Sequence, residues 1–186
     1  MNKHKALLIT DMIDLYIKGE KPLVPIETRQ KLIFKVKKAV RLARSKKIPL
    51  IYINSAFRGF DPIYKLINYR EQSMEKRNDP KVIDELKPGK NDYVLKKRGY
   101  DGFWLSGLEK LLKKLRIKDL YLTGCQTDCC IRETAVTASH LGYNVYVLKD
   151  CCQTNREFGQ IAALRFFSIC SKGVIEVSDL KKFHFT

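Results

Sequence analysis

Long apolar runs are missing from this sequence. No stretch approaches the roughly 18 consecutive apolar residues that a membrane-spanning helix requires. The apolar run near the N-terminus, within MNKHKALLITDMIDLYI, is too short for a secretory signal. These absences argue against a membrane protein and against a secreted one. We therefore expect a cytoplasmic protein with no membrane partner.

Cysteine pairs with the spacing of metal-binding motifs are also missing. Five of the six cysteines fall between residues 125 and 152, but they form CxxxCC and CC, whereas zinc sites favour pairs of the C-x2-C kind. Adjacent cysteines make poor disulfides, and a chain of 186 residues that is 45% hydrophobic can bury a core without them. We expect reduced thiols in a single domain over residues 1–186. A zinc or iron–sulfur cluster is the alternative, which metal analysis would test.

Acidic residues are few relative to basic ones. Twenty Asp and Glu against 36 Lys and Arg give a net charge of +16, which can serve a nucleic-acid partner. The lysines are nevertheless spread over segments such as KVKKAVRLARSKK and LEKLLKKLRIK, and no RNA- or DNA-binding motif accompanies them. We therefore expect no nucleic-acid partner. A lysine-rich, glutamine-poor surface also suits a protein that works at high temperature.

Short, nearly continuous apolar runs recur along the chain and predict strands. Runs without alternation are typical of parallel strands that are covered on both faces. The predicted strands cover residues 6–10, 49–54, 93–97, 119–124, 144–150 and 173–177. With helices between them, they predict an α/β fold, a three-layer α/β/α sandwich with a central, mainly parallel six-stranded sheet of Rossmann-like type.

Apolar stripes predict the helices between these strands. One stripe consists of Leu32, Val36, Ala39, Val40 and Ala43, and another of Trp104, Leu108, Leu111, Leu112 and Leu115. Two further helices are expected, one ending near residue 141 and one over residues 156–171, each followed by a glycine. Residues 55–92 do not follow this alternation of strands and helices. Because ligands of open α/β sheets bind beyond the carboxyl ends of the strands, this insert is either a pocket wall or an ordinary surface excursion.

Three chemically distinct groups follow the carboxyl ends of predicted strands. Asp11 follows ALLIT, Lys97 closes YVLKK, and the cysteine-rich stretch TGCQTDCC follows DLYL. Each alone has a structural explanation, as a cap, a solvated lysine or small buried thiols. Together they indicate a nucleophilic site, because a helix N-terminus and a lysine favour a thiolate and a carboxylate can carry its proton. A catalytically silent binding protein is the alternative, which thiol labelling would test.

Four blocks in order resemble the isochorismatase-like cysteine hydrolase superfamily, which includes nicotinamidases, N-carbamoylsarcosine amidases and ureidoacrylate amidohydrolases. The blocks are ALLITDMID, VIDELKPGKNDYVLKKRGYDGF, LTGCQTDCCIRETA and GYNVYVLKDC, and the resemblance runs from about residue 5 to residue 175. It implies that Asp11 is the catalytic acid and base, Lys97 the catalytic lysine and Cys130 the nucleophile. It also implies a cis peptide bond between Cys125 and Gln126, with backbone N–H groups near Gln126 and Cys130 turned toward an oxyanion.

The sequence departs from the metal-dependent nicotinamidases where they carry an Asp-x-His pair. Residues 53–55 read INS at that place, and the chain contains only His4, His140 and His184, so we expect no metal site. Cys130 also distinguishes the chain from relatives that cleave the vinyl ether of isochorismate, which commonly lack the cysteine, although that activity stays an alternative. The resemblance thus implies a cofactor-free, metal-independent hydrolase that cleaves the C–N bond of a small carboxamide or ureido compound through a thioester.

Residues that flank the motifs are candidates for the substrate pocket, because they are near the motifs in sequence. An arginine and aromatic rings would suit a small planar amide with an anionic tail. The candidates are Tyr16, Phe57, Arg58, Tyr100, Phe103 and Trp104, together with Gln126. The expected partners are this small amide and further copies of the chain, in a dimer or a tetramer.

Overall fold

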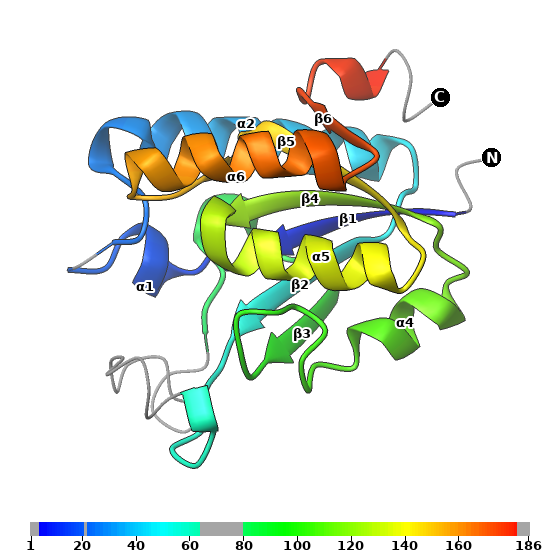
Figure 1. Ribbon diagram of the computed structural model, residues 1–186, viewed down its shortest axis with the longest axis horizontal. Coiled ribbons are helices and arrows are strands. Elements are labelled where there is room, and N and C mark those ends of the chain that lie inside the picture. Colours follow the sequence, from blue (N-terminus) through cyan, green and yellow to red (C-terminus); the bar gives the residue numbers. More distant parts are fainter. Residues whose placement is uncertain (1–3, 21, 64–79, 182–186) are drawn as a thin grey trace.

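Six parallel strands form one central sheet in the computed structural model, which describes residues 4–20, 22–63 and 80–181 (Figure 1). The strands are β1 (Lys5–Thr10), β2 (Leu50–Ser55), β3 (Tyr93–Lys97), β4 (Asp119–Cys125), β5 (Asn144–Gln153) and β6 (Gly173–Ile175). Their order is β3-β2-β1-β4-β5-β6, and each neighbouring pair is parallel. The predicted α/β class and six-stranded sheet are confirmed, with differences at the strand ends.

Helices cover both faces of the sheet. The short α1 (Asp14–Ile17) and the long α2 (Ile26–Ser45) pack on one face, while α4 (Leu108–Lys114), α5 (Arg132–His140) and α6 (Glu157–Cys170) pack on the other. Successive side chains of a strand point to opposite faces. Accordingly, the two sides of β1 supply both layers of the core, with Leu7 and Ile9 on the α2 side and Leu8 on the side of α4, α5 and α6.

The strand order places a ligand site between β1 and β4. The chain runs outward from β1 to β2 and β3, then returns to the other side of β1 for β4, β5 and β6. Such a reversal opens a crevice at the carboxyl ends of the two central strands. The register pairs Thr10 with Gly124 and Ser55 with Lys97, so the last residues of four neighbouring strands meet at this edge.

Gly124 permits close contact between β1 and β4 at this edge. Its φ is +117°, and a Cβ atom there would overlap the backbone carbonyl of Thr10. The register with β5 shifts between Leu122 and Gly124, and β5 then continues to Gln153, three residues past its expected end. A side chain at residue 124 would push apart the two strands that carry Asp11 and the cysteine-rich stretch.

One predicted helix is shorter than its apolar stripe. The α2 stripe is buried as expected, but α4 begins only at Leu108, and Trp104 lies in the preceding turn. Gly107 separates the two because its φ is +77°, a left-handed conformation that does not continue a right-handed helix. The part of the insert over residues 64–79 lies outside the described residues. Among the helices that the structure describes, none combines the length and apolarity needed to cross a bilayer.

Candidate active site

Asp11, Lys97 and Cys130 meet at the carboxyl edge of the sheet. The Lys97 ammonium lies 3.0 Å from Oδ2 of Asp11 and donates a hydrogen bond to Sγ of Cys130 at 3.3 Å. Asp11 and Lys97 are fully buried, and Cys130 is 7% exposed. These residues come from the end of β1, the end of β3 and the turn after β4. The fold thus brings together the three positions that the sequence analysis selected.

Hydrogen bonds fix both the lysine and the aspartate. The three N–H bonds of the Lys97 ammonium point to Oγ of Ser55 at 2.6 Å, the carbonyl of Gly99 at 2.9 Å and the thiol of Cys130. Oδ1 of Asp11 accepts the Ser55 backbone N–H at 2.6 Å, whereas Oδ2 lies in the ion pair with Lys97 and accepts no other hydrogen bond from the described residues. Oδ2 therefore keeps lone pairs that can receive a proton, while the ion pair with Lys97 holds it in place.

The backbone at Asp11 is bent so that its side chain faces the lysine. Its φ of 54° is left-handed, which is uncommon for a residue other than glycine but tolerated by aspartate. Its N–H donates to the carbonyl of Ile53 at 3.0 Å, which continues the pairing of β1 with β2 for one more residue. The strand therefore ends with its carboxylate buried at the sheet edge.

Charge and burial set the protonation of the trio. Burial alone would lower the pKa of Lys97, but the negative charges of Asp11 and Cys130 outweigh burial and raise the pKa above its usual value. The hydrogen bond that the Cys130 thiol donates to Cys129, burial and the Asp11 charge raise the pKa of the Cys130 thiol, and Lys97 opposes them. The net direction favours the neutral thiol of Cys130, while the Lys97 charge acts toward the thiolate, as the sequence predicts. The Cys130 thiol therefore needs a base to remove its proton. Asp11 can serve as that base, because its carboxylate pairs with the same Lys97 ammonium that contacts the thiol.

The cysteine-rich stretch forms a cis peptide bond and then a helical turn. The bond between Cys125 and Gln126 is cis, as the resemblance implies. A π-helical turn (Thr127–Ile131) follows, in which the Ile131 N–H donates to the Gln126 carbonyl at 3.1 Å, and α5 continues from it. Cys130 therefore lies in the first turn of a longer helical segment, where backbone N–H groups lack the acceptors found deeper in a helix.

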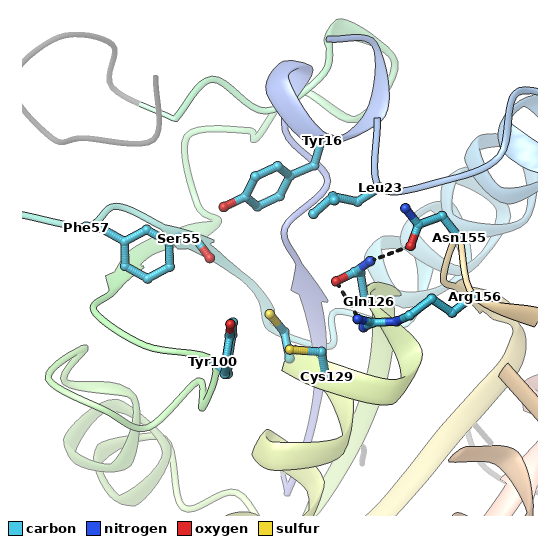
Figure 2. Close-up of a pocket in the computed structure, with 10 residues that line it drawn as sticks. Tyr16, Leu23, Ser55, Phe57, Tyr100, Gln126, Cys129, Asn155 and Arg156 are labelled. Carbon is cyan, nitrogen blue, oxygen red and sulfur yellow. Dashed lines mark hydrogen bonds between the residues drawn. The ribbon is translucent and has the colours of Figure 1, made fainter. Parts of the chain in front are cut away.

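A cavity of about 240 Å³ opens over Cys130 (Figure 2). Aromatic and apolar side chains form one wall, and polar side chains form the facing wall. In Figure 2, Phe57, Ser55 and Tyr100 lie on one side of the cavity and Gln126, Asn155 and Arg156 on the other, with Cys129 between them. Tyr16, Leu23 and Cys130 complete the lining. A compact cavity with few polar groups beside reactive side chains is typical of a site for a small molecule.

The polar wall is a connected network (Figure 2). Nε2 of Gln126 donates to Oδ1 of Asn155 at 2.9 Å, and Oε1 of Gln126 accepts from Arg156 at 3.4 Å. Arg156 also holds both carboxylate oxygens of Asp128, at 2.8 and 3.0 Å. Gly159 lies against the same carboxylate, and a Cβ atom there would overlap it. The start of α6 is thereby fastened to the turn that carries Cys130.

Four of the seven predicted pocket residues line this cavity, namely Tyr16, Phe57, Tyr100 and Gln126. Arg58, Phe103 and Trp104 do not, and each has another contact. The Arg58 guanidinium lies 5.7 Å from the ring centroid of Phe60, the Phe103 ring stacks on Tyr143 at 6.2 Å, and Trp104 packs against Gly99 beside a separate hollow. Closeness in sequence gave no information on the direction of these side chains.

Five cavity residues were missing from the predicted pocket: Leu23, Ser55, Cys129, Asn155 and Arg156. The rule that selected Asp11 and Lys97 would have found Ser55, which directly follows the predicted strand 49–54, but not Asn155 and Arg156, because β5 continues three residues past its expected end at residue 150. Leu23 comes from the loop between α1 and α2, and no pattern in the sequence points to it.

No metal-binding group is found among the side chains that the structure describes, because no three His, Cys, Asp or Glu residues converge. At the position of the nicotinamidase Asp-x-His pair, Asn54 is buried and its side-chain amide makes no hydrogen bond within the part of the chain that the structure describes. His4 hydrogen-bonds the Arg116 carbonyl at 2.7 Å, and His140 ends α5. His184 lies outside the described residues.

Comparison with known proteins agrees with this arrangement. The family model described as "Isochorismatase domain" matches residues 5–179. Ureidoacrylate amidohydrolase RutB of Pseudomonas savastanoi pv. phaseolicola is 30% identical over an alignment of 186 positions, gaps included. The alignment covers 86% of this chain and 75% of that protein. The crystal structure of N-carbamoylsarcosine amidase from Thermoplasma acidophilum is 26% identical, with a TM-score of 0.83 over 94% of this chain and 96% of that one. Nicotinamidase/pyrazinamidase PncA of Bacillus subtilis shares the fold at 20% identity, with a TM-score of 0.82 over 93% of this chain and all of that one.

Proposed function

This chain belongs to the isochorismatase family, and from that premise we propose that it is a metal-independent cysteine hydrolase that cleaves the C–N bond of a small carboxamide or ureido compound. The observation that carries the proposal is the position of Cys130 at the cavity, 3.3 Å from the Lys97 ammonium, which itself lies 3.0 Å from Asp11. The names of two similar proteins, a ureidoacrylate amidohydrolase and an N-carbamoylsarcosine amidase, support an amide substrate.

The first half of the proposed reaction forms a thioester. Oδ2 of Asp11 takes the proton of the Cys130 thiol, and the Lys97 ammonium stabilises the thiolate. The thiolate attacks the substrate carbonyl carbon, and the π electrons move to the oxygen. Backbone N–H groups of Gln126 and Cys130 hold this oxyanion. When the intermediate collapses, the C–N bond breaks and the leaving nitrogen takes the proton from Asp11.

The second half hydrolyses the thioester. Asp11, again ionised, takes a proton from a water molecule, whose oxygen attacks the carbonyl carbon. The C–S bond breaks, the product carboxyl group leaves, and Cys130 regains its proton from Asp11. Asp11 therefore carries a proton in both directions, while Lys97 keeps its own throughout because its pKa is raised. No cofactor takes part in this sequence of steps.

The cavity walls suggest the shape of the substrate. The amide and guanidinium N–H groups of Gln126, Asn155 and Arg156 can donate to acceptor atoms, and the aromatic rings opposite can cover a flat group. The Arg156 charge is shared with Asp128, so it favours an acceptor such as a carboxylate or a carbonyl without demanding a full charge. We propose a small planar amide with hydrogen-bond acceptors at its far end.

Ammonia release from a panel of small amides tests the proposed function. The panel would contain simple carboxamides, N-carbamoyl amino acids and ureidoacrylate, each incubated with the purified chain and followed by a coupled ammonia assay. Release from at least one compound, with a mass increase on the peptide that contains Cys130 during turnover, is the expected result. No release across the panel, together with no mass increase on the peptide that contains Cys130, would favour a binding protein.

Removal of metal ions is expected to leave the reaction rate unchanged. The reason is that residues 53–55, INS, supply neither the carboxylate nor the imidazole of the nicotinamidase metal pair. The measurement is the rate of ammonia release before and after exhaustive chelation, with a metal-dependent hydrolase chelated in parallel as a control. A rate that falls and is restored by one divalent ion would contradict the proposal.

Removal of the Lys97 charge is expected to move the alkylation of Cys130 to higher pH. Lys97 lowers the pKa of Cys130, so in Lys97→Met, which keeps the shape of the side chain, the thiolate should form at higher pH. Cys129 must be removed first, because its hydrogen bond to Cys130 lowers its own pKa and makes it a competing thiol. Iodoacetamide rates across pH, read by peptide mass in a Cys129→Ala background, give the shift.

Lys96→Ala is the matched control for this measurement, because residue 96 neighbours Lys97 on β3 but makes no hydrogen bond to Cys130. Its alkylation profile should equal that of the background variant. Identical profiles for Lys97→Met and the background would show that the lysine does not act on the thiol.

A further inference from the structure

The loop after β3, residues 98–103, takes part in the site at two points. The Gly99 carbonyl accepts a hydrogen bond from the Lys97 ammonium at 2.9 Å, and Tyr100 lines the cavity (Figure 2). We call residues 98–103 the lysine loop. Connecting loops are in general more mobile than the strands and helices that they join. The position of the Lys97 ammonium therefore depends on what holds this loop.

Helix α5 holds the lysine loop on the helical face that begins at Cys130. Oγ1 of Thr134 accepts the Gly102 N–H at 2.8 Å and donates to the Cys130 carbonyl at 2.6 Å. Further along the helix, Oγ1 of Thr137 donates to Oδ2 of Asp101 at 2.8 Å. Cys130, Thr134 and Thr137 follow the spacing i, i+4 and i+7, which places them on one face of a helix. The nucleophile and both contacts to the loop therefore share one face.

Thr134 and Gly102 fit together closely. Both are buried, and a Cβ atom at residue 102 would lie 2.9 Å from Oγ1 and 3.0 Å from Cγ2 of Thr134. A hydroxyl carries one hydrogen and two lone pairs, so it can donate to the carbonyl and accept from the N–H at the same time. Valine has the same shape as threonine but can do neither. Without the hydroxyl, the buried Gly102 N–H would lose its acceptor, which is unfavourable unless the loop moves to find another.

We propose that Thr134 is a positioning residue, which holds the lysine loop against the turn that carries Cys130. Thr134 does not line the cavity, so it acts through the loop and not on a bound molecule. The proposal rests on the proposed function in one respect, because it assumes that the Lys97 ammonium acts on the Cys130 thiol. When the loop moves, the Gly99 carbonyl leaves the ammonium. The ammonium then turns toward its charged partner Asp11 and away from the thiol.

Alkylation of Cys130 by iodoacetamide across pH tests the proposal without a substrate. The ionisable groups that shift the pKa of this thiol are Asp11, Lys97 and Cys129. All variants are made in the Cys129→Ala background, so that Asp11 and Lys97 remain. We expect Thr134→Val to move the alkylation profile to higher pH, in the same direction as Lys97→Met. The shift should be smaller than in Lys97→Met, because the ammonium is displaced but not removed.

Two further variants are matched controls. Thr134→Ser keeps the hydroxyl and should keep the profile of the background variant. Ser139→Ala removes another hydroxyl of α5, which donates to the carbonyl four residues earlier at 2.9 Å. The hydrogen bonds of Ser139 go to Ala135 and Cys170 and not to the lysine loop, so this profile should also be unchanged. A shift in either control as large as that in Thr134→Val would overturn the proposal.

Combining Thr134→Val with Lys97→Met shows whether the threonine acts through the lysine. The threonine substitution should shift the profile while Lys97 is present and should add nothing once residue 97 is methionine. An equal shift in both backgrounds would overturn the proposal and leave the proposed function standing. So would the absence of a shift in Thr134→Val when Lys97→Met does shift. No shift in Lys97→Met would contradict the proposed role of the lysine, and this proposal with it.

Gly102→Ala tests the same contact from the side of the loop, and it replaces Thr134→Val if circular dichroism shows that the valine variant does not fold. The added methyl group would crowd Oγ1 and Cγ2 of Thr134, so it pushes the loop away from α5. Its alkylation profile should move to higher pH as well, and again only while Lys97 is present. A folded Gly102→Ala variant with the profile of the background would overturn the proposal.

Discussion

Replacing Cys130 by alanine is expected to reduce kcat by about 10⁴-fold or more, because no other thiol can form the thioester at that position. Its Sγ is the sulfur that receives a hydrogen bond from the Lys97 ammonium, and Lys97 in turn pairs with Asp11. Ammonia release at saturating substrate measures the loss. Mass spectrometry during turnover should also show that the acyl adduct on the peptide with Cys130 is gone.

Cys129→Ala is the matched control and should keep kcat within about tenfold of the wild type. The comparison is demanding because Cys129 also lines the cavity, and its hydrogen bond to Cys130 lowers its pKa. By acidity alone, Cys129 would be the better thiolate. The proposed assignment depends instead on the Lys97 hydrogen bond and on access to the Asp11 carboxylate. Activity that survives in Cys130→Ala and disappears in Cys129→Ala would reverse it.

The positions of the reactive groups could be predicted from the sequence because they depend on strand ends. Continuous apolar runs predict buried parallel strands, and the carboxyl ends of such strands meet at one edge. Asp11 and Lys97 follow directly from this rule, although 86 residues separate them, and the cysteine-rich turn follows from it as well. Ser55 obeys the same rule, so its place beside Lys97 was available to the sequence analysis.

The pocket residues could not be predicted as well because they lie in turns. Side chains on a strand alternate with period two, but the turn after β3 directs Tyr100 into the cavity while Trp104 packs on Gly99 outside it. That choice depends on backbone dihedral angles such as the left-handed φ of Gly107. The polar wall could not be predicted from the sequence either, because Gln126 and Arg156 come together only through the contact of α6 with the cysteine-rich turn.

The protonation of Cys130 also could not be predicted, because it depends on burial. A cysteine beside a lysine at a helix start suggests a thiolate. In the folded chain the hydrogen bond to Cys129, burial and the charge of Asp11 raise the pKa of the Cys130 thiol despite the lysine. The direction of the shift depends on which way the Cys129–Cys130 hydrogen bond runs, on burial and on the Asp11 charge, all of which are set by the fold.

Asp11→Asn is expected to separate thiol reactivity from turnover. Asparagine keeps the size of the side chain and can still accept the Ser55 N–H, but it cannot take a proton from Cys130 or return one to the leaving nitrogen. We expect kcat to fall by about 10²–10⁴-fold, with little change in KM. Alkylation of Cys130 should change in the opposite direction, because the Asp11 charge raises the pKa of that thiol and its removal leaves the Lys97 ammonium acting alone.

The two measurements together distinguish a proton carrier from a residue that merely shapes the site. Both are made in the Cys129→Ala background, with kcat from ammonia release and thiolate formation from iodoacetamide rates across pH. For a proton carrier, the Asp11→Asn variant alkylates at lower pH than its parent while its kcat collapses, since a reactive thiolate without an acid cannot expel an amine. If Asp11 only held Lys97 in position, the loss of the ion pair would let the lysine move away, and alkylation and turnover would fall together. A parallel fall in both rates would therefore remove Asp11 from the proton path.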